Sequence, residues 1–93
     1  ESGRIGCKRL DSGILGQQAY ARFLYQGTID QATLVHSTET GFTGKRKWTQ
    51  TPIRIVQKGD IWRADWPLPQ GTTGWFINVE MDGRIVSSEY HDL

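Results

Sequence analysis

The sequence has few of the residues from which compact functional sites are usually built. It contains one cysteine, Cys7, in 93 residues, so it can form neither an internal disulfide nor a multi-cysteine metal site. Two histidines occur, and the formal net charge is only +1, from 11 Lys+Arg and 10 Asp+Glu. A nearly neutral chain lacks the long-range field that attracts nucleic acid or an anionic membrane. Apolar runs such as Trp75–Ile77 are short, far below the roughly 20 residues that span a bilayer.

Glycines and aromatic residues, in contrast, are spread along the whole chain. The 11 glycines separate short runs of Thr, Ile, Val and aromatic residues, a pattern typical of strands joined by turns. Helical periodicity is not sustained, although a short helix around Leu15–Leu24 competes with a strand there. With about seven strands at turn spacings of roughly 8–12 residues, the chain is predicted to be all-β. We expect one immunoglobulin/fibronectin-like β-sandwich domain over residues 1–93.

Turn residues set the expected limits of the strands. The expected strands are Arg4–Arg9, Gln17–Tyr25, Ile29–Ser37, Trp48–Val56, Ile61–Trp66, Thr73–Met81 and Arg84–Tyr90. Asp11–Gly13 is expected to be a turn, Thr40–Gly44 a loop, and Asp82-Gly83 the two-residue turn of a hairpin. Pro52 indicates an edge or a bulge, because proline has no N–H for a ladder. The stretch Pro67–Gly71 is expected to cross between sheets.

Side-chain alternation divides the residues of each expected strand between an inward and an outward face. In Thr73–Met81, Trp75 is expected to point inward, which turns Phe76 and Asn78 outward. The residues expected to be buried together are Ala32, Leu34, Trp62, Ala64, Trp75, Ile77 and Val79. Trp48 beside a lysine and Trp66 beside a proline are expected to be partly exposed.

Four residues are candidates for a ligand site or a domain interface: Phe76, Trp48, Trp66 and Asn78. An exposed aromatic ring offers flat apolar surface on which a sugar can stack or a partner domain can pack. Phe76 is the best single candidate, because Asn78 and Glu80 would border it with polar groups. The alternative, that these rings only cap the ends of the sandwich, stays open.

Catalysis and cofactor binding are poorly supported by the sequence. His36 and Ser37 are neighbours in an expected strand and should point to opposite faces. Ser87 and Ser88 lie near His91 and an aspartate, but at a chain end that tends to fray. We predict no catalytic site, no metal and no cofactor. The basic run Lys45–Lys47 is interpreted as a solvated turn, and the glycines before it as a hairpin-type loop rather than a phosphate-binding loop.

From Asp30 onward, the order of several short motifs is informative. A small-apolar strand ending in Ser/Thr precedes a Trp, a Pro, a Gly-x-x-Trp-x-Ala strand, a Pro-containing crossing, an aromatic strand and a Gly-x-x-Val-Ser-Ser-Glu-Tyr segment. These motifs are Ala32–Thr38, Trp48, Pro52, Gly59–Ala64, Leu68–Thr73, Trp75–Val79 and Gly83–Tyr90. In this order they resemble the fibronectin type III or immunoglobulin-like accessory modules of secreted bacterial hydrolases, with α/β-hydrolase, peptidase or sulfatase-like parents.

The resemblance implies a non-catalytic role in a larger protein. Its implied partner is the catalytic domain of the parent hydrolase, on which the module would pack, and its implied location is the periplasm or the outside of the cell. The chain begins at Glu1 without a signal-type apolar stretch, which is expected of an excised or processed piece. A carbohydrate-binding module that uses exposed aromatic side chains on polysaccharide is the alternative interpretation.

Overall fold

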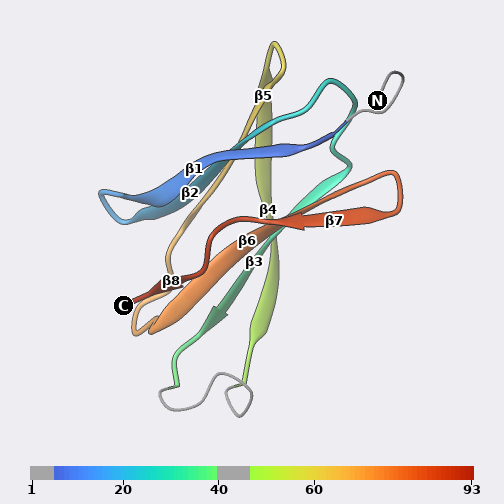
Figure 1. Ribbon diagram of the computed structural model, residues 1–93. Helices are drawn as coiled ribbons and strands as arrows, with labels where there is room; N and C mark the ends of the chain where they lie inside the picture. The colour runs from blue at the N-terminus through green and yellow to red at the C-terminus, as the bar shows by residue number, and fades with distance from the viewer. Residues whose placement is uncertain (1–5, 40–46) are drawn as a thin grey trace.

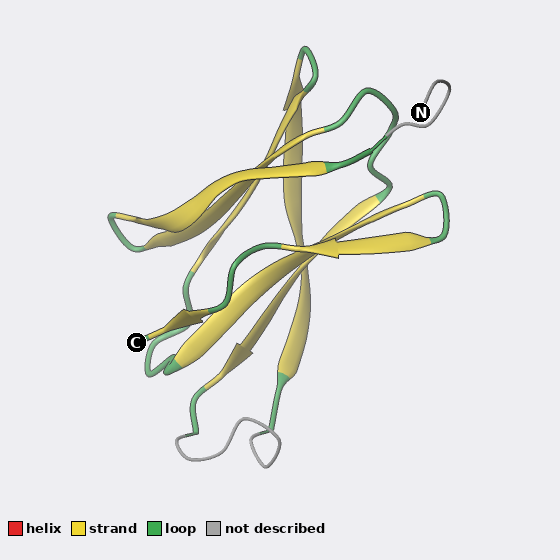
Figure 2. Ribbon diagram, in the orientation of Figure 1, coloured by secondary structure: helices red, strands yellow, loops and turns green. Residues whose placement is uncertain are grey.

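The computed structural model describes residues 6–39 and 47–93, and these contain strands and turns but no helix (Figure 2). The strands are β1 (Lys8–Leu15), β2 (Gln18–Leu24), β3 (Gln31–Ser37), β4 (Thr49–Lys58), β5 (Ile61–Pro67), β6 (Gly74–Met81), β7 (Arg84–Ser87) and β8 (His91–Asp92). The prediction of an all-β chain is confirmed. In the described part of the chain, nothing forms a helix that could cross a membrane.

The strands pair antiparallel into one curled sheet of order β1-β2-β5-β4-β3-β6-β7, with β8 added to β6 (Figure 1). The long strand β4 joins two halves, because its residues 49–53 pair with β3 and its residues 54–58 pair with β5. Pro52 lies where β4 pairs only with β3, so the prediction of an edge position is confirmed.

The buried apolar side chains form one cluster between the two halves of the sheet. All seven residues predicted to form the core belong to it, which confirms the predicted alternation. The first half supplies three fully buried alanines, Ala19, Ala21 and Ala64, together with the large Phe23 and Trp62. The second half supplies mainly large side chains, among them Trp75 and Ile77.

The N-terminal region differs from its prediction. β1 runs from Lys8 to Leu15 and includes Asp11–Gly13, so the predicted turn is wrong. Residues 4 and 5 of the predicted first strand, Arg4–Arg9, lie outside the described residues. Pairing with β2 outweighs the preference of Asp11–Gly13 for a turn. A bulge between Arg9 and Asp11 accommodates the shift in strand register. The actual turn follows Leu15, where Gly16 adopts a φ of 66°. The competing helix is also wrong, because β2 shows the alternating burial of a strand.

The C-terminal region confirms one prediction and corrects another. Asp82 and Gly83 have φ values of 54° and 75° between paired Met81 and Arg84, as a two-residue hairpin turn requires. The last strand was expected to reach Tyr90, but β7 ends at Ser87 and a separate strand, β8, follows. The predicted loop 40–44 and most of the basic run 45–47 lie outside the described residues.

Candidate functional site

Three aromatic rings gather on the outer face of the second half of the sheet. Trp48 immediately precedes β4, Phe76 lies in β6, and Tyr90 immediately precedes β8. The Trp48 ring centroid lies 5.9 Å from that of Phe76 and 6.1 Å from that of Tyr90. We call these three residues the aromatic patch. Val35 of β3 is the cross-strand partner of Phe76 and is only 5% exposed, although it also points outward.

Most positions that flank the aromatic patch in the strand register carry neutral polar side chains, but Asp92 of β8 is charged, and its Oδ1 accepts a hydrogen bond of 3.2 Å from the Tyr90 hydroxyl. Gln50 is the partner of Val35 in β4, while Asn78 follows two residues after Phe76 and pairs with Thr33 and Ser87. The Ser87 hydroxyl donates a hydrogen bond of 2.5 Å to Asn78 Oδ1, which holds the amide against the face of the sheet. Apolar rings at the centre and polar groups around them are the composition of a protein interface.

The structure brings together three of the four predicted site residues. Phe76 and Asn78 share one face of β6, and Trp48 packs on Phe76. Trp66 is separate: it is 37% exposed at the end of β5 and shares the face of Trp62 and Ala64. Sequence reasoning missed Tyr90, because a strand was expected to continue through it.

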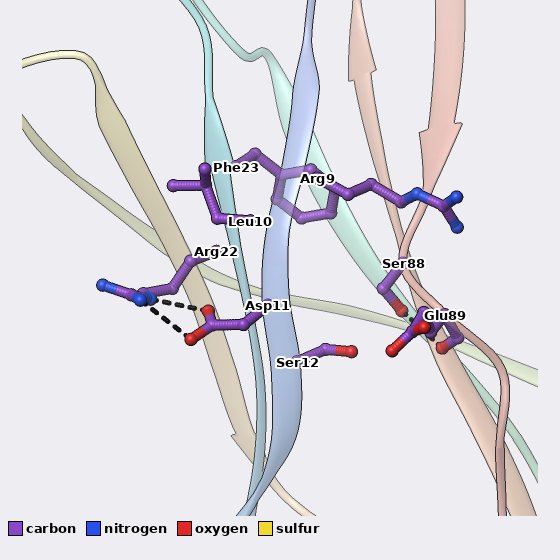
Figure 3. A pocket seen from close by; sticks show the side chains of 8 residues that line it. All are labelled: Arg9, Leu10, Asp11, Ser12, Arg22, Phe23, Ser88 and Glu89. Carbon is purple, nitrogen blue, oxygen red and sulfur yellow. Dashed lines mark hydrogen bonds and ion pairs between the residues drawn. The ribbon is translucent and has the colours of Figure 1, made fainter.

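A cleft of about 280 Å³ opens between β1 and the segment that follows β7 (Figure 3). It is lined by Arg9, Leu10, Asp11, Ser12, Arg22, Phe23, Ser88 and Glu89. Figure 3 shows the paired side chains of Asp11 and Arg22 on the side of β1 away from Ser88 and Glu89. Arg22 contacts both carboxylate oxygens, at 2.6 and 2.8 Å, and this hydrogen bonding lowers the pKa of the Asp11 carboxyl.

The two hydroxyl groups of the cleft are engaged in bonds within the protein. Ser12 Oγ lies 2.7 Å from Nε2 of His91, and the buried Ser88 Oγ accepts from the Ile77 N–H and donates to the Glu89 carbonyl. These contacts engage both hydroxyl groups within the protein, while the charged Arg9 and Glu89 also line the cleft. The contact between Ser12 and His91 ties the C-terminal segment to β1, and we call this junction the seam.

The contact of Ser12 with His91 is a serine–histidine pair that the sequence did not indicate, since the two residues are 79 positions apart. The His91 ring also stacks on Trp75, with centroids 4.4 Å apart and planes inclined by 15°. Nucleophilic catalysis needs, in addition, a group that orients the imidazole and donors for an oxyanion. The described contacts of His91 supply neither of these two groups. They connect the C-terminal segment to Ser12 of β1 and to Trp75 of β6. His36 and Ser37 do not form such a pair; Ser37 Oγ accepts from the Glu39 N–H.

Neither the thiol nor the acidic and imidazole groups of the described residues form a site. Cys7 is half-buried, and this burial raises the pKa of its thiol, with a smaller opposing effect of Arg84. A raised pKa keeps the thiol protonated and weakly nucleophilic at neutral pH. Within residues 6–39 and 47–93, no three His, Cys, Asp or Glu side chains are grouped as metal ligands.

Comparisons with known proteins assign no family to this chain. No protein-family model, no curated protein and no solved structure matches it. Among the described residues, the aromatic patch is the surface feature most typical of a binding site.

Proposed function

We propose that the chain is a non-catalytic accessory module that docks through its aromatic patch on the catalytic domain of a larger secreted hydrolase. The observation that carries this proposal is the packing of Trp48, Phe76 and Tyr90 on the outer face of a sheet whose inner face already forms the core. The motif order from Asp30 onward is the reason for choosing a hydrolase as the parent.

The inclination of the rings favours a protein partner over a sugar. The planes of Trp48 and Phe76 are inclined by 58°, and those of Trp48 and Tyr90 by 73°. A sugar ring stacks on the open face of an aromatic ring, so a linear glycan is best served by faces that lie in one plane. Steeply inclined rings instead form a compact apolar knob, which suits a pocket on a partner protein.

The surroundings of the aromatic patch support the same choice. Thr33, Gln50, Asn78 and Ser87, which flank it, are polar and carry no charge, and Asp92 adds one carboxylate beside Tyr90. Apolar rings with polar residues around them suit docking that depends mainly on burial of apolar surface. Tyr90 remains 43% exposed, so apolar area is still available for burial.

Binding of the isolated chain to the remainder of its parent protein tests this proposal. Phe76→Ala should weaken the complex by at least about 2 kcal/mol, roughly 30-fold in Kd, because central aromatic residues dominate such interfaces. Trp66→Ala is the matched control: it removes a partly exposed aromatic side chain outside the aromatic patch and should leave Kd unchanged. Titration calorimetry measures both, and circular dichroism checks that each variant is folded.

Two results would overturn the proposal. Equal affinity of the native chain and Phe76→Ala for the parent would remove the aromatic patch from the interface. Saturable binding of the isolated chain to soluble oligosaccharides, followed by Trp fluorescence and lost in Trp48→Ala, would assign a carbohydrate-binding module instead. If the chain is a docking module, the isolated chain should show no binding to oligosaccharides.

A further inference from the structure

The C-terminal segment contributes to both faces of the sheet at once. Tyr90 belongs to the aromatic patch on the outer face, whereas His91 stacks on the buried Trp75 on the inner face. The same alternation occurs in β6, where Trp75 points inward and Phe76 outward, and Trp75 is the register partner of His91. The Tyr90 hydroxyl also donates a hydrogen bond of 3.2 Å to Oδ1 of Asp92, the second residue of β8. The position of the Tyr90 ring therefore depends on how firmly β8, including His91, is held on β6.

Few backbone contacts hold this segment in place. β8 contains two residues, and beyond it the Leu93 N–H donates to the Thr73 carbonyl at 2.8 Å. So short a pairing is not stable by itself. The His91 ring adds two side-chain contacts, the stack on Trp75 and the hydrogen bond to Ser12 of β1.

We infer that Ser12 is a positioning residue for the aromatic patch. Its hydrogen bond to His91 holds β8 on β6, and this in turn keeps Tyr90 against Trp48 on the opposite face. Ser12 itself lies on the inner side of the edge strand, in register with the buried Ala21, and so takes no part in the surface it organises. Without the bond, β8 opens more often and the aromatic patch loses its third ring.

Contacts with β2 hold the strand that carries Ser12 in place. β1 pairs with β2 along its length, and the bidentate contact between Asp11 and Arg22 fixes the residue next to Ser12 to the outer side of that pair. The bulge between Arg9 and Asp11 shifts the alternation, so that Asp11 faces outward and Ser12 inward. Ser12 is thereby aimed across the seam at His91 (Figure 3 shows its hydroxyl pointing from β1 toward the segment of Ser88).

Ser12→Ala tests the inference on the isolated chain, with NMR as the measurement. Loss of one hydrogen bond should accelerate exchange of the Leu93 amide by about twofold to tenfold and weaken the ring-to-ring cross-peaks between Tyr90 and Trp48. His91→Phe, which keeps a ring for stacking on Trp75 but removes the nitrogen, should have the same effect. Ser12→Thr retains the hydroxyl and should preserve both signals.

Arg54→Gln is the control, because it removes an exposed ion pair between β4 and β5 and affects neither β1 nor His91; it should leave the Tyr90–Trp48 cross-peaks intact. Unchanged exchange at Leu93 and unchanged cross-peaks in Ser12→Ala and His91→Phe would overturn the inference. Equal acceleration at the amides of β3 would also overturn it, since that shows general destabilisation. The inference rests on the proposed function only in calling the aromatic patch a docking surface. All its measurements use the chain without a partner, so a failure of docking would leave them unaffected.

Discussion

The two outer faces of the curled sheet use their side chains in different ways. On the half formed by β1, β2, β5 and the end of β4, charged residues pair with one another: Asp65 contacts both Arg54 and Arg63, at 2.8 and 3.3 Å. The Arg63 guanidinium also lies 4.8 Å from the centre of the Tyr20 ring, a cation–π contact. On the other half, the outer face carries the aromatic patch, with mostly neutral residues around it and Asp92 beside Tyr90. The first face is therefore marked by ion pairs and the second by contacts between aromatic rings.

The inner faces of the two halves differ as well. Ala21 and Ala64 are directly paired on the first half, so its backbone approaches the core closely. Large buried side chains occur on both halves, Phe23 on the first and Trp75, Leu34 and Ile77 on the second. Removal of volume should therefore be costly at these large side chains, and addition of volume at the alanine pair of the first half.

The largest effect is expected from Ile77→Ala or Leu34→Ala in the second half. Each removes a fully buried side chain and leaves a cavity, which costs about 2–5 kcal/mol in the free energy of unfolding. Denaturant melts of the native chain and the two variants measure this difference. A loss below about 1 kcal/mol for both would contradict the packing described for β3 and β6.

Ala64→Leu tests the first half in the opposite direction. Ala64 is completely buried in the core. The additional methyl groups of leucine must therefore displace Ala21 or Ile55, the residues paired with Ala64 in the neighbouring strands. Overpacking of this kind costs about 1–3 kcal/mol. A melt that shows Ala64→Leu to be neutral or stabilising would mean that the first half is loosely packed.

Gly83→Val should destabilise the β6–β7 hairpin through the backbone alone. Nothing lies within 4 Å of a Cβ built on Gly83, so the cost of about 1–2 kcal/mol arises from its φ of 75°. Hydrogen exchange in β7 should accelerate. Gly83→Asn, which tolerates positive φ, is the control and should have a smaller effect. Equal protection in the native chain and Gly83→Val would contradict the described turn.

A pH dependence is expected from His36 on the second half. Burial lowers the pKa of its imidazole, and its Nδ1 has no hydrogen-bond partner among the described residues. Since the unfolded chain binds the proton more readily, stability is complete above the unfolded pKa near 6.5 and is lost as pH falls through the folded pKa. Melts between pH 7.5 and pH 5 should show this loss, and His36→Gln should remove it. A flat profile in the native chain would contradict it.

Local patterns in the sequence predicted the parts of the fold in which neighbours in the chain decide the structure. Alternation around Trp75 placed that ring inward and Phe76 outward, and Asp82-Gly83 predicted its hairpin because positive φ is a property of the residues themselves. Asp11–Gly13, in contrast, has the composition of a turn but lies in β1. There, pairing with β2 and the contact of Asp11 with Arg22 outweigh local preference, and both depend on the rest of the sheet.

The candidate site was predictable only in part for the same reason. Phe76 and Trp48 were identified from their exposure pattern, and they do meet. Tyr90 was missed because a strand that stops and starts again within three residues has no signature in the sequence. The contact between Ser12 and His91 links opposite ends of the chain, so only the tertiary structure could reveal it.

The smallest effect is expected from Arg54→Gln on the charged outer face. Partial burial of Asp65 raises the pKa of its carboxyl, but the hydrogen bonds and charges of Arg54 and Arg63 outweigh it, so the pKa lies below the usual value. A lowered folded pKa contributes stability above the unfolded value near 3.8, and this contribution is lost as pH falls through the folded pKa. Because the Arg54 side chain is 63% exposed, its loss should cost only about 0.2–1 kcal/mol at neutral pH and less in high salt. Melts at pH 7 and pH 2.5 should show the difference between native chain and variant shrinking in acid. A cost above 2 kcal/mol that persists in acid would mean that this face, too, is held by packing, and the contrast between the two faces would fail.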